Sequence, residues 1–238
     1  MLLWPRFWHT KEHHSWKLDN KAGRLVRDGR LAARVMGFAA FDMQVRGPFE
    51  FIGSDASELI YSGSLPPEEP LGPASRHQWP TVLRMGGGDD VIGYQRGGPS
   101  SRFDGGRGRD RFSFIVDKYN CFCPGAPDVG RLNLAEGTLR YRFAGGQEVR
   151  TRVTGFEDVR WWSSADATII GTGGPNKIFG RLAKPGRDMR IFGKGGNDYL
   201  RGGPGSDVLV GGSGQDVADG QGGDADRCSA ESRLHCEL

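Results

Sequence analysis

Residues 193–219 repeat a nine-residue pattern of glycines, one aspartate and three residues centred on an apolar side chain. The three lines read GKGGNDYLR, GGPGSDVLV and GGSGQDVAD. Successive side chains of a strand point to opposite faces, so Leu200 and Leu209 should face a core while their neighbours face outward. Nine residues are too few for a helical hairpin and suit one half-coil of a parallel β structure. The pattern therefore predicts short parallel strands joined by tight glycine turns.

The rest of the chain also favours strands. RFSFIV (111–116) and LRYRF (139–143) are rich in β-branched and aromatic residues, as strands are. No segment shows a sustained 3.6-residue apolar period with caps, so we expect little helix. The proline-rich segment 65–76 is typical of an exposed loop. The predicted fold class is all-β, a parallel β-roll or β-helix.

Weaker copies of the nine-residue line occur on both sides of the best ones. The residues aligned with the aspartate are Asn176 in GTGGPNKIF, Asp188 in AKPGRDMRI, Asp226 in GQGGDADRC with one extra residue, Asp90 in MGGGDDVIG, Asp110 in GGRGRDRFS, Glu58 in GSDASELIY and Arg102 in GGPSSRF. Asn176 is neutral, and Arg102 should prevent its line from binding a cation. The Asp188 line keeps only one glycine and places Arg190 where a core residue belongs.

A longer repetition suggests two tandem units. RVMGF (34–38) and RVTGF (152–156) share four of five residues, and each is followed by a weak line and then by glycine–aspartate lines. We expect a poorly ordered N-terminal segment at 1–17, a first degenerate unit at 18–116 and a better-preserved second unit at 117–238. The glycine–aspartate repeats of the second unit span 171–228.

The aspartates and glycines suit a hard cation. Glycine accounts for 39 of 238 residues, about 16% against a usual share of about 7%. Glycine turns can point several carbonyl oxygens inward, and stacked turns add carboxylates from Asp198, Asp207 and Asp216. Six or more hard oxygens are the ligands that Ca²⁺ prefers. Without the ion, stacked carboxylates repel and a glycine-rich chain loses much entropy on ordering, so several structural Ca²⁺ ions should drive folding.

The line GGxGxDxUx resembles the RTX (repeats-in-toxin), or haemolysin-type calcium-binding, repeat. The resemblance is strongest at 193–219, good at 85–93 and 105–113, and weak at 171–191 and 220–228. It implies a β-roll whose turns alternate between two edges, with each ion between turns two lines apart. Asp198 and Asp216 would then share one ion, and Asp207 would pair with Asp188 and with Asp226. The implied carbonyl ligands lie near Gly195, Asn197, Gly203, Gly205, Gly212 and Gly214.

Other features exclude some functions and leave others open. The net charge of +3 and the scattered arginines do not indicate nucleic-acid binding, and no apolar stretch is long enough to span a membrane. No zinc-protease or serine-hydrolase motif is present, so we do not expect an enzyme. His9, His13 and His14 fit a solvated segment better than a metal site. Cys228 and Cys236 suit a small disulfide, with free thiols as the alternative, and Cys121 and Cys123 would form a strained ring.

Three functions remain open. The favoured one is a secreted or cell-surface calcium-binding module, because an exported chain of this family would fold where calcium is abundant. A second is a parallel β-helix that binds or acts on an acidic polysaccharide through outward Arg, Trp and Tyr side chains, with Trp161 and Trp162 as candidates. Trp79 could serve in the same way, although all three suit a β core. A third is a spacer or adhesin segment of a larger surface protein, which could contact a host surface.

Overall fold

The fold is a two-sheet β-solenoid, described from a computed structural model that covers residues 2–3, 14–44, 47–63, 79–94, 100–116, 127–143, 148–163, 165–180, 187–223 and 225–237. Several residues singled out in the sequence lie outside these ranges: Cys121, Cys123, the segment 65–76, His9 and His13. Within these ranges no helix occurs, and so none that is long and apolar enough to cross a membrane. The expected all-β fold is confirmed.

Sheet A is parallel throughout. Its ten strands, in spatial order, are β1 (Leu2–Leu3), β5 (Ala40–Gln44), β7 (Leu59–Gly63), β9 (Val91–Tyr94), β11 (Arg111–Val116), β15 (Asp158–Ser163), β17 (Lys177–Gly180), β19 (Tyr199–Arg201), β21 (Val217–Asp219) and β23 (Ser232–Leu234). These counts refer to the described residues. Leu2, Leu3, Trp16 and Lys17 thus lie in strands, although the sequence suggested poor order for residues 1–17.

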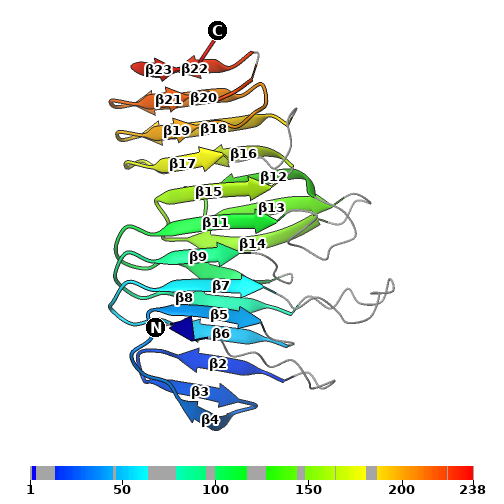
Figure 1. Cartoon of the computed structure of the whole chain (residues 1–238), viewed down its shortest axis with the longest axis vertical. Helices are drawn as coiled ribbons and strands as arrows, with labels where there is room; N and C mark the ends of the chain where they lie inside the picture. Colours follow the sequence, from blue (N-terminus) through cyan, green and yellow to red (C-terminus); the bar gives the residue numbers. More distant parts are fainter. Residues whose placement is uncertain are drawn as a thin grey trace.

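Sheet B has thirteen described strands. In spatial order they are β22 (Arg227–Ser229), β20 (Val208–Ser213), β18 (Met189–Gly195), β16 (Asp166–Ile170), β12 (Pro127–Asn133), β13 (Thr138–Phe143), β14 (Glu148–Thr154), β10 (Arg102–Asp104), β8 (Thr81–Arg84), β6 (Phe49–Ile52), β2 (Trp16–Asp19), β3 (Arg24–Arg27) and β4 (Arg30–Arg34). The chain alternates between the sheets, and the turns stack along the long axis (Figure 1).

Two antiparallel meanders, β2–β3–β4 and β12–β13–β14, interrupt the parallel order of sheet B. Residues 34–38 follow the first meander and residues 152–156 end the second, so the repeated sequence marks equivalent places in the fold. β14 also pairs in parallel with β10, which joins the two halves of the stack. The division into units at residue 117 stays a prediction.

The core lies between the sheets and changes in character along the axis. Toward the N-terminus it is aromatic: Phe41 packs on Phe51, and Phe114 stacks on Trp161 with ring centroids 4.1 Å apart. Toward the C-terminus it is a thin aliphatic layer, with Leu200 and Leu209 fully buried. These two leucines face inward as the nine-residue pattern predicted.

The last turn is closed by a disulfide. Cys228 and Cys236 are bonded, with Cα atoms 5.9 Å apart, so the expected pairing is confirmed. Cys228 continues the inward row of Leu209 on β20, and the bond ties β22 to the C-terminal segment. The described part of the chain contains no free cysteine.

Candidate metal centre

The residue two positions before each inward core residue occupies the same place in every turn, and we call this place the slot. On the sheet A edge the slots stack in one column: Glu58, Asp90, Asp110, Glu157, Asn176, Asp198, Asp216 and Glu231. On the sheet B edge, Met189, Asp207 and Asp226 form a second column. Turns therefore alternate between two edges, and aspartates two lines apart become neighbours.

The columns are linked by hydrogen bonds from backbone to carboxylate. The backbone N–H of Asp198 donates to Oδ1 of Asp216 at 2.8 Å, and that of Asp90 donates to Oδ1 of Asp110 at 2.7 Å. In the second column the N–H of Asp207 donates to Oδ1 of Asp226 at 2.7 Å. Each carboxylate thus satisfies a buried donor of the neighbouring turn, where an unpaired donor would cost about 1–3 kcal/mol.

The second carboxylate oxygen of most slot aspartates has no partner. Oδ2 is buried without a hydrogen bond in Asp90, Asp110, Asp198, Asp216 and Asp226. Asp207 differs, since its Oδ2 accepts the backbone N–H of Gly203 at 2.6 Å. Buried anionic oxygens are costly unless a proton, a donor or a cation compensates them. Five positions along the two columns therefore present an uncompensated oxygen.

Glycine at the first position of a line makes room for the slot carboxylate. A Cβ on Gly193 would lie 2.0 Å from Oδ2 of Asp198 and 2.6 Å from the carbonyl oxygen of Gly211. A Cβ on Gly220 would meet Oδ2 of Asp226 at 2.4 Å and the carbonyl oxygen of His235 at 2.1 Å. At each of these glycines, a carboxylate oxygen and a carbonyl oxygen of the next turn thus occupy the space that a side chain would fill.

The six residues named as carbonyl ligands lie in these turns. Gly212 and Gly214 have φ of 115° and 141° and face the carbonyl oxygens of Lys194 and Gly196. Gly205 faces the carbonyl oxygen of Arg187, and Gly195 ends β18. The side chain of Asn197 accepts the N–H of Gln215, and Gly203 donates to Asp207 as described. Their role as ligands stays a prediction.

Burial makes five of the slot aspartates hard to ionise. Desolvation, the largest cause, raises the pKa of Asp90 to about 7 and those of Asp110 and Asp198 to about 6. Burial raises the pKa of Asp207 and Asp226 as well. The backbone donors oppose these shifts, and neighbouring carboxylates add to them. A divalent cation beside Oδ2 would reverse the balance and hold the carboxylates charged.

These residues fit a calcium ion, provided that backbone oxygens complete its shell. Among the described residues no three His, Cys, Asp or Glu side chains cluster as a metal site. A site here therefore has at most two carboxylates, and carbonyl oxygens must supply the rest. Ca²⁺ accepts such mixed oxygen shells, whereas zinc prefers nitrogen and sulfur ligands.

Two sequence alignments were wrong by one residue. Met189, and not Asp188, is in register with Asp207, because Ile191 is the inward residue of its line. Asp188 is exposed, and its Oδ1 accepts the N–H of Ser206 at 2.9 Å, outside the column. In the line before β10 the slot holds Ser101, whose hydroxyl accepts the N–H of Thr81, and Arg102 points outward.

Three glutamates were missed as slot residues. Glu157 accepts the N–H of Asp110 at 2.8 Å, Glu231 that of Asp216 at 2.7 Å, and Glu237 that of Asp226 at 2.7 Å. None of the three follows the paired glycines of the repeat. For Glu157 a signal was available, because it precedes the buried Val159 by two residues, the spacing of every slot.

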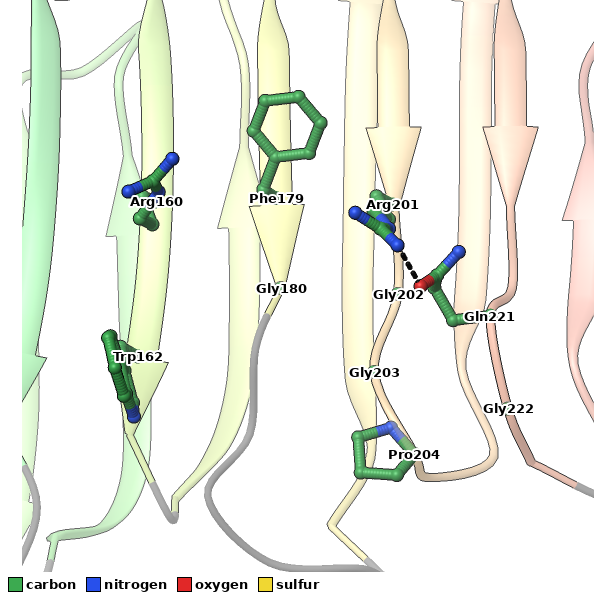
Figure 2. Close-up of a pocket in the computed structure, with 10 residues that line it drawn as sticks. All are labelled: Arg160, Trp162, Phe179, Gly180, Arg201, Gly202, Gly203, Pro204, Gln221 and Gly222. Carbon is green, nitrogen blue, oxygen red and sulfur yellow. Dashed lines mark hydrogen bonds between the residues drawn. The ribbon is translucent and has the colours of Figure 1, made fainter.

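A groove on the outer face of sheet A bears on the polysaccharide alternative. Arg160, Trp162, Phe179 and Arg201 line it from β15, β17 and β19, and Arg201 hydrogen-bonds Gln221 (Figure 2). Trp161 is fully buried in the core and cannot contact a glycan. The candidate platform therefore reduces to Trp162 on this face, while Trp79 is partly buried.

Comparison with known proteins agrees with this geometry. A family described as the RTX calcium-binding nonapeptide repeat matches residues 190–225, in four copies. Comparison with curated proteins gives no match. The matched segment contains the slots of Asp198, Asp207 and Asp216. The chain thus carries repeats of the RTX calcium-binding family at residues 190–225, built into a β-solenoid.

Proposed function

We propose that the protein is a calcium-folded β-roll module, non-enzymatic and secreted or displayed at a cell surface. The observation that carries the proposal is the set of five buried Oδ2 atoms without a partner, all in slots and all stacked in register. In Asp110, Asp198, Asp216 and Asp226 this atom faces a glycine that leaves no side chain beside it. Calcium would supply charge compensation and cross-link adjacent turns.

The proposed sites follow the two columns. Asp198 and Asp216 share one ion, Asp90 and Asp110 another, and Asp207 and Asp226 a third. In residues 190–225, which we call the RTX segment, backbone carbonyl oxygens complete the coordination shells of the ions. These carbonyl oxygens lie near Gly195, Asn197, Gly203, Gly205, Gly212 and Gly214. Asp188 lies outside the column and belongs to none of these three sites.

Folding and location are linked in this proposal. Stacked carboxylates and glycine-rich turns disfavour the ordered state without the ion, and binding energy then becomes folding energy. The C-terminal lines would stay unfolded where calcium is scarce and fold where it is abundant, which supports an extracellular place of action.

The test compares one double variant with a matched control. Asp198→Asn/Asp216→Asn keeps both backbone hydrogen bonds but removes the charge beside the ion. We expect native mass spectrometry to show at least one fewer Ca²⁺ per chain and circular dichroism to require more calcium for folding. Asp188→Asn, outside the column, should change neither result. An unchanged spectrum in chelator, together with no calorimetric binding of calcium to the wild type, would falsify the proposal.

A further inference from the structure

A row of arginines crosses the outer face of sheet B. Residues in register on seven adjacent strands, from β14 to β22, are Arg150, Arg140, Arg131, Thr168, Arg190, Val208 and Arg227. We call these five arginines the arginine row; all five are exposed. Neighbouring strands are about 4.8 Å apart, so the row extends about 29 Å.

Three members of the row lie directly opposite one another. Arg131 faces Arg140 and Arg140 faces Arg150 across the antiparallel meander. Like charges in directly opposed positions destabilise a sheet. The chain as a whole is nearly balanced, at +3, so this density of one sign is a local property of the surface.

Carboxylates compensate little of this charge. Of the row, only Arg150 has a salt bridge within the described residues, to Glu148. Asp166, on the central strand β16, pairs instead with Arg187. Arg102 and Arg152, which face each other on β10 and β14, add two more exposed guanidinium groups beside the row. Within the described part of the chain, the surface therefore offers several guanidinium groups without a salt bridge at regular intervals.

The geometry favours an extended polymer with carboxylate or sulfate groups. A guanidinium group presents a planar pair of donors that matches such groups in two-point contacts. Single-stranded nucleic acid binds by stacking bases on aromatic side chains, and the row contains none. The two positions of the row that are not arginine hold Thr168 and Val208.

We propose that the arginine row binds an acidic polysaccharide, laid across the strands of sheet B with its anionic groups on successive arginines. The row adjoins the sheet B slot column, since Arg227 follows Asp226, but its side chains are exposed whereas the slot carboxylates are buried. It is also distinct from the groove on sheet A. It needs the folded solenoid but no calcium ligand. Carboxylated and sulfated glycans share the required chemistry.

The test uses the full chain at saturating calcium and two triple variants. Arg131→Gln/Arg140→Gln/Arg150→Gln removes the centre of the row. Arg160→Gln/Lys177→Gln/Arg201→Gln removes the same number of exposed charges from sheet A and also tests the groove. The probes are hyaluronan for carboxylates, dextran sulfate for sulfates, and neutral dextran. Calorimetry measures affinity, and circular dichroism verifies that each variant folds.

We expect at least one acidic glycan to bind, with affinity that falls as salt rises, and neutral dextran not to bind. The row variant should lose about tenfold or more in affinity for the glycan, and the sheet A variant less than about threefold. The reason is that each arginine that contacts an anionic group releases counterions, and its removal takes away that contribution to affinity. If the row variant fails to fold, Arg→Lys changes at the same three positions keep the charge and test the two-point contacts. Three outcomes would refute the proposal. They are equal losses of affinity in both variants, no glycan binding, or tighter binding of RNA or phosphatidylglycerol vesicles than of both glycans.

Discussion

Each slot aspartate uses its two oxygens differently. Oδ1 accepts a backbone N–H of the adjacent turn, while Oδ2 is left for an ion in Asp90, Asp110, Asp198, Asp216 and Asp226. Asn176 shows what an amide does in this place: its Oδ1 accepts the N–H of Thr172 in its own line, and its Nδ2 donates to the carbonyl oxygen of Glu157 in the adjacent turn. Only a carboxylate can perform both roles, which explains why the repeat needs aspartate and not any polar residue.

The first-position glycine should be intolerant of a side chain for steric reasons. Gly193→Ala would place a methyl group 2.0 Å from Oδ2 of Asp198, and we expect it to cost about 1–3 kcal/mol and to weaken calcium binding. Gly173→Ala is the control, since a Cβ there meets nothing within 4 Å. Calcium titration followed by circular dichroism measures both. Equal effects of the two substitutions would show that the glycines matter only for chain flexibility.

The raised pKa values of the slot aspartates predict an unusual dependence of apo stability on pH. A folded-state pKa of about 6–7 for Asp90, Asp110 and Asp198, above the ordinary 3.8, means that protonation favours the folded state. This stabilisation is complete below about pH 4 and is lost as the pH rises through 6–7.

In chelator we therefore expect the melting temperature to fall between about pH 5 and pH 8. Saturating calcium should remove this decrease, because the ion replaces the protons. Thermal melts at several pH values, with and without calcium, measure it. A melting temperature in chelator that rises with pH over this range would contradict the assignment of buried, proton-binding aspartates.

At the scale of single elements, the last turn depends on its disulfide. β23 is fully exposed, and the inward residues of this end are small, Ala218 and Cys228. A terminal turn of a solenoid contacts one neighbour only and frays first. The Cys228–Cys236 bond closes a short loop, which should be worth about 2–3 kcal/mol.

Cys228→Ser/Cys236→Ser should therefore loosen the last turn without unfolding the stack. Hydrogen exchange should accelerate at β22 and β23 and stay unchanged at β16. Calcium affinity of the Asp207–Asp226 pair should fall, because Asp226 lies two residues from Cys228. A uniform rise in exchange over the whole chain would show instead that the disulfide stabilises the molecule globally.

The sequence predicted the parallel strands and six slots where glycines and aspartates keep the nine-residue period. The sequence prediction failed where a feature other than the glycine–aspartate pattern sets the register of the strands. Asp188 has the glycine of the pattern, but the inward position of Ile191 sets the slot at Met189. The meanders carry alternating strand patterns without the period, so the antiparallel pairing of β12, β13 and β14 was not foreseen. Glu157 lacks the paired glycines and was taken for a surface charge.

At the scale of the whole molecule, the size of the buried side chains predicts which part of the chain depends on calcium for its stability. The N-terminal part buries large aromatic side chains such as Phe41, Phe51 and Phe114, each contributing about 1.5–3 kcal/mol. The RTX segment buries only aliphatic side chains between its sheets: Ile191, Leu200, Leu209 and Ala218. Ion binding must therefore contribute a larger share of stability in the C-terminal lines.

We expect chelation to unfold the molecule from its C-terminal end. In chelator, hydrogen exchange should become fast at β18–β23 while the strands around Trp161 stay protected, and the near-ultraviolet signal of this buried tryptophan should persist. Calcium should restore protection in the C-terminal lines. Simultaneous loss of protection and of the tryptophan signal would show that the two parts fold as one cooperative unit.

The pairing of β10 with β14 has a consequence for the order of assembly. Most turns of the RTX segment stack on a turn only 18 residues away, whereas the contact between Asp104 and Thr154 spans 50. Closing the longer loop costs about 1 kcal/mol more, and it requires the β12–β14 hairpins to form first. We therefore expect the turns up to β11 and the turns after β14 to nucleate separately. They should pair with each other late, after the β12–β13–β14 meander has formed between them.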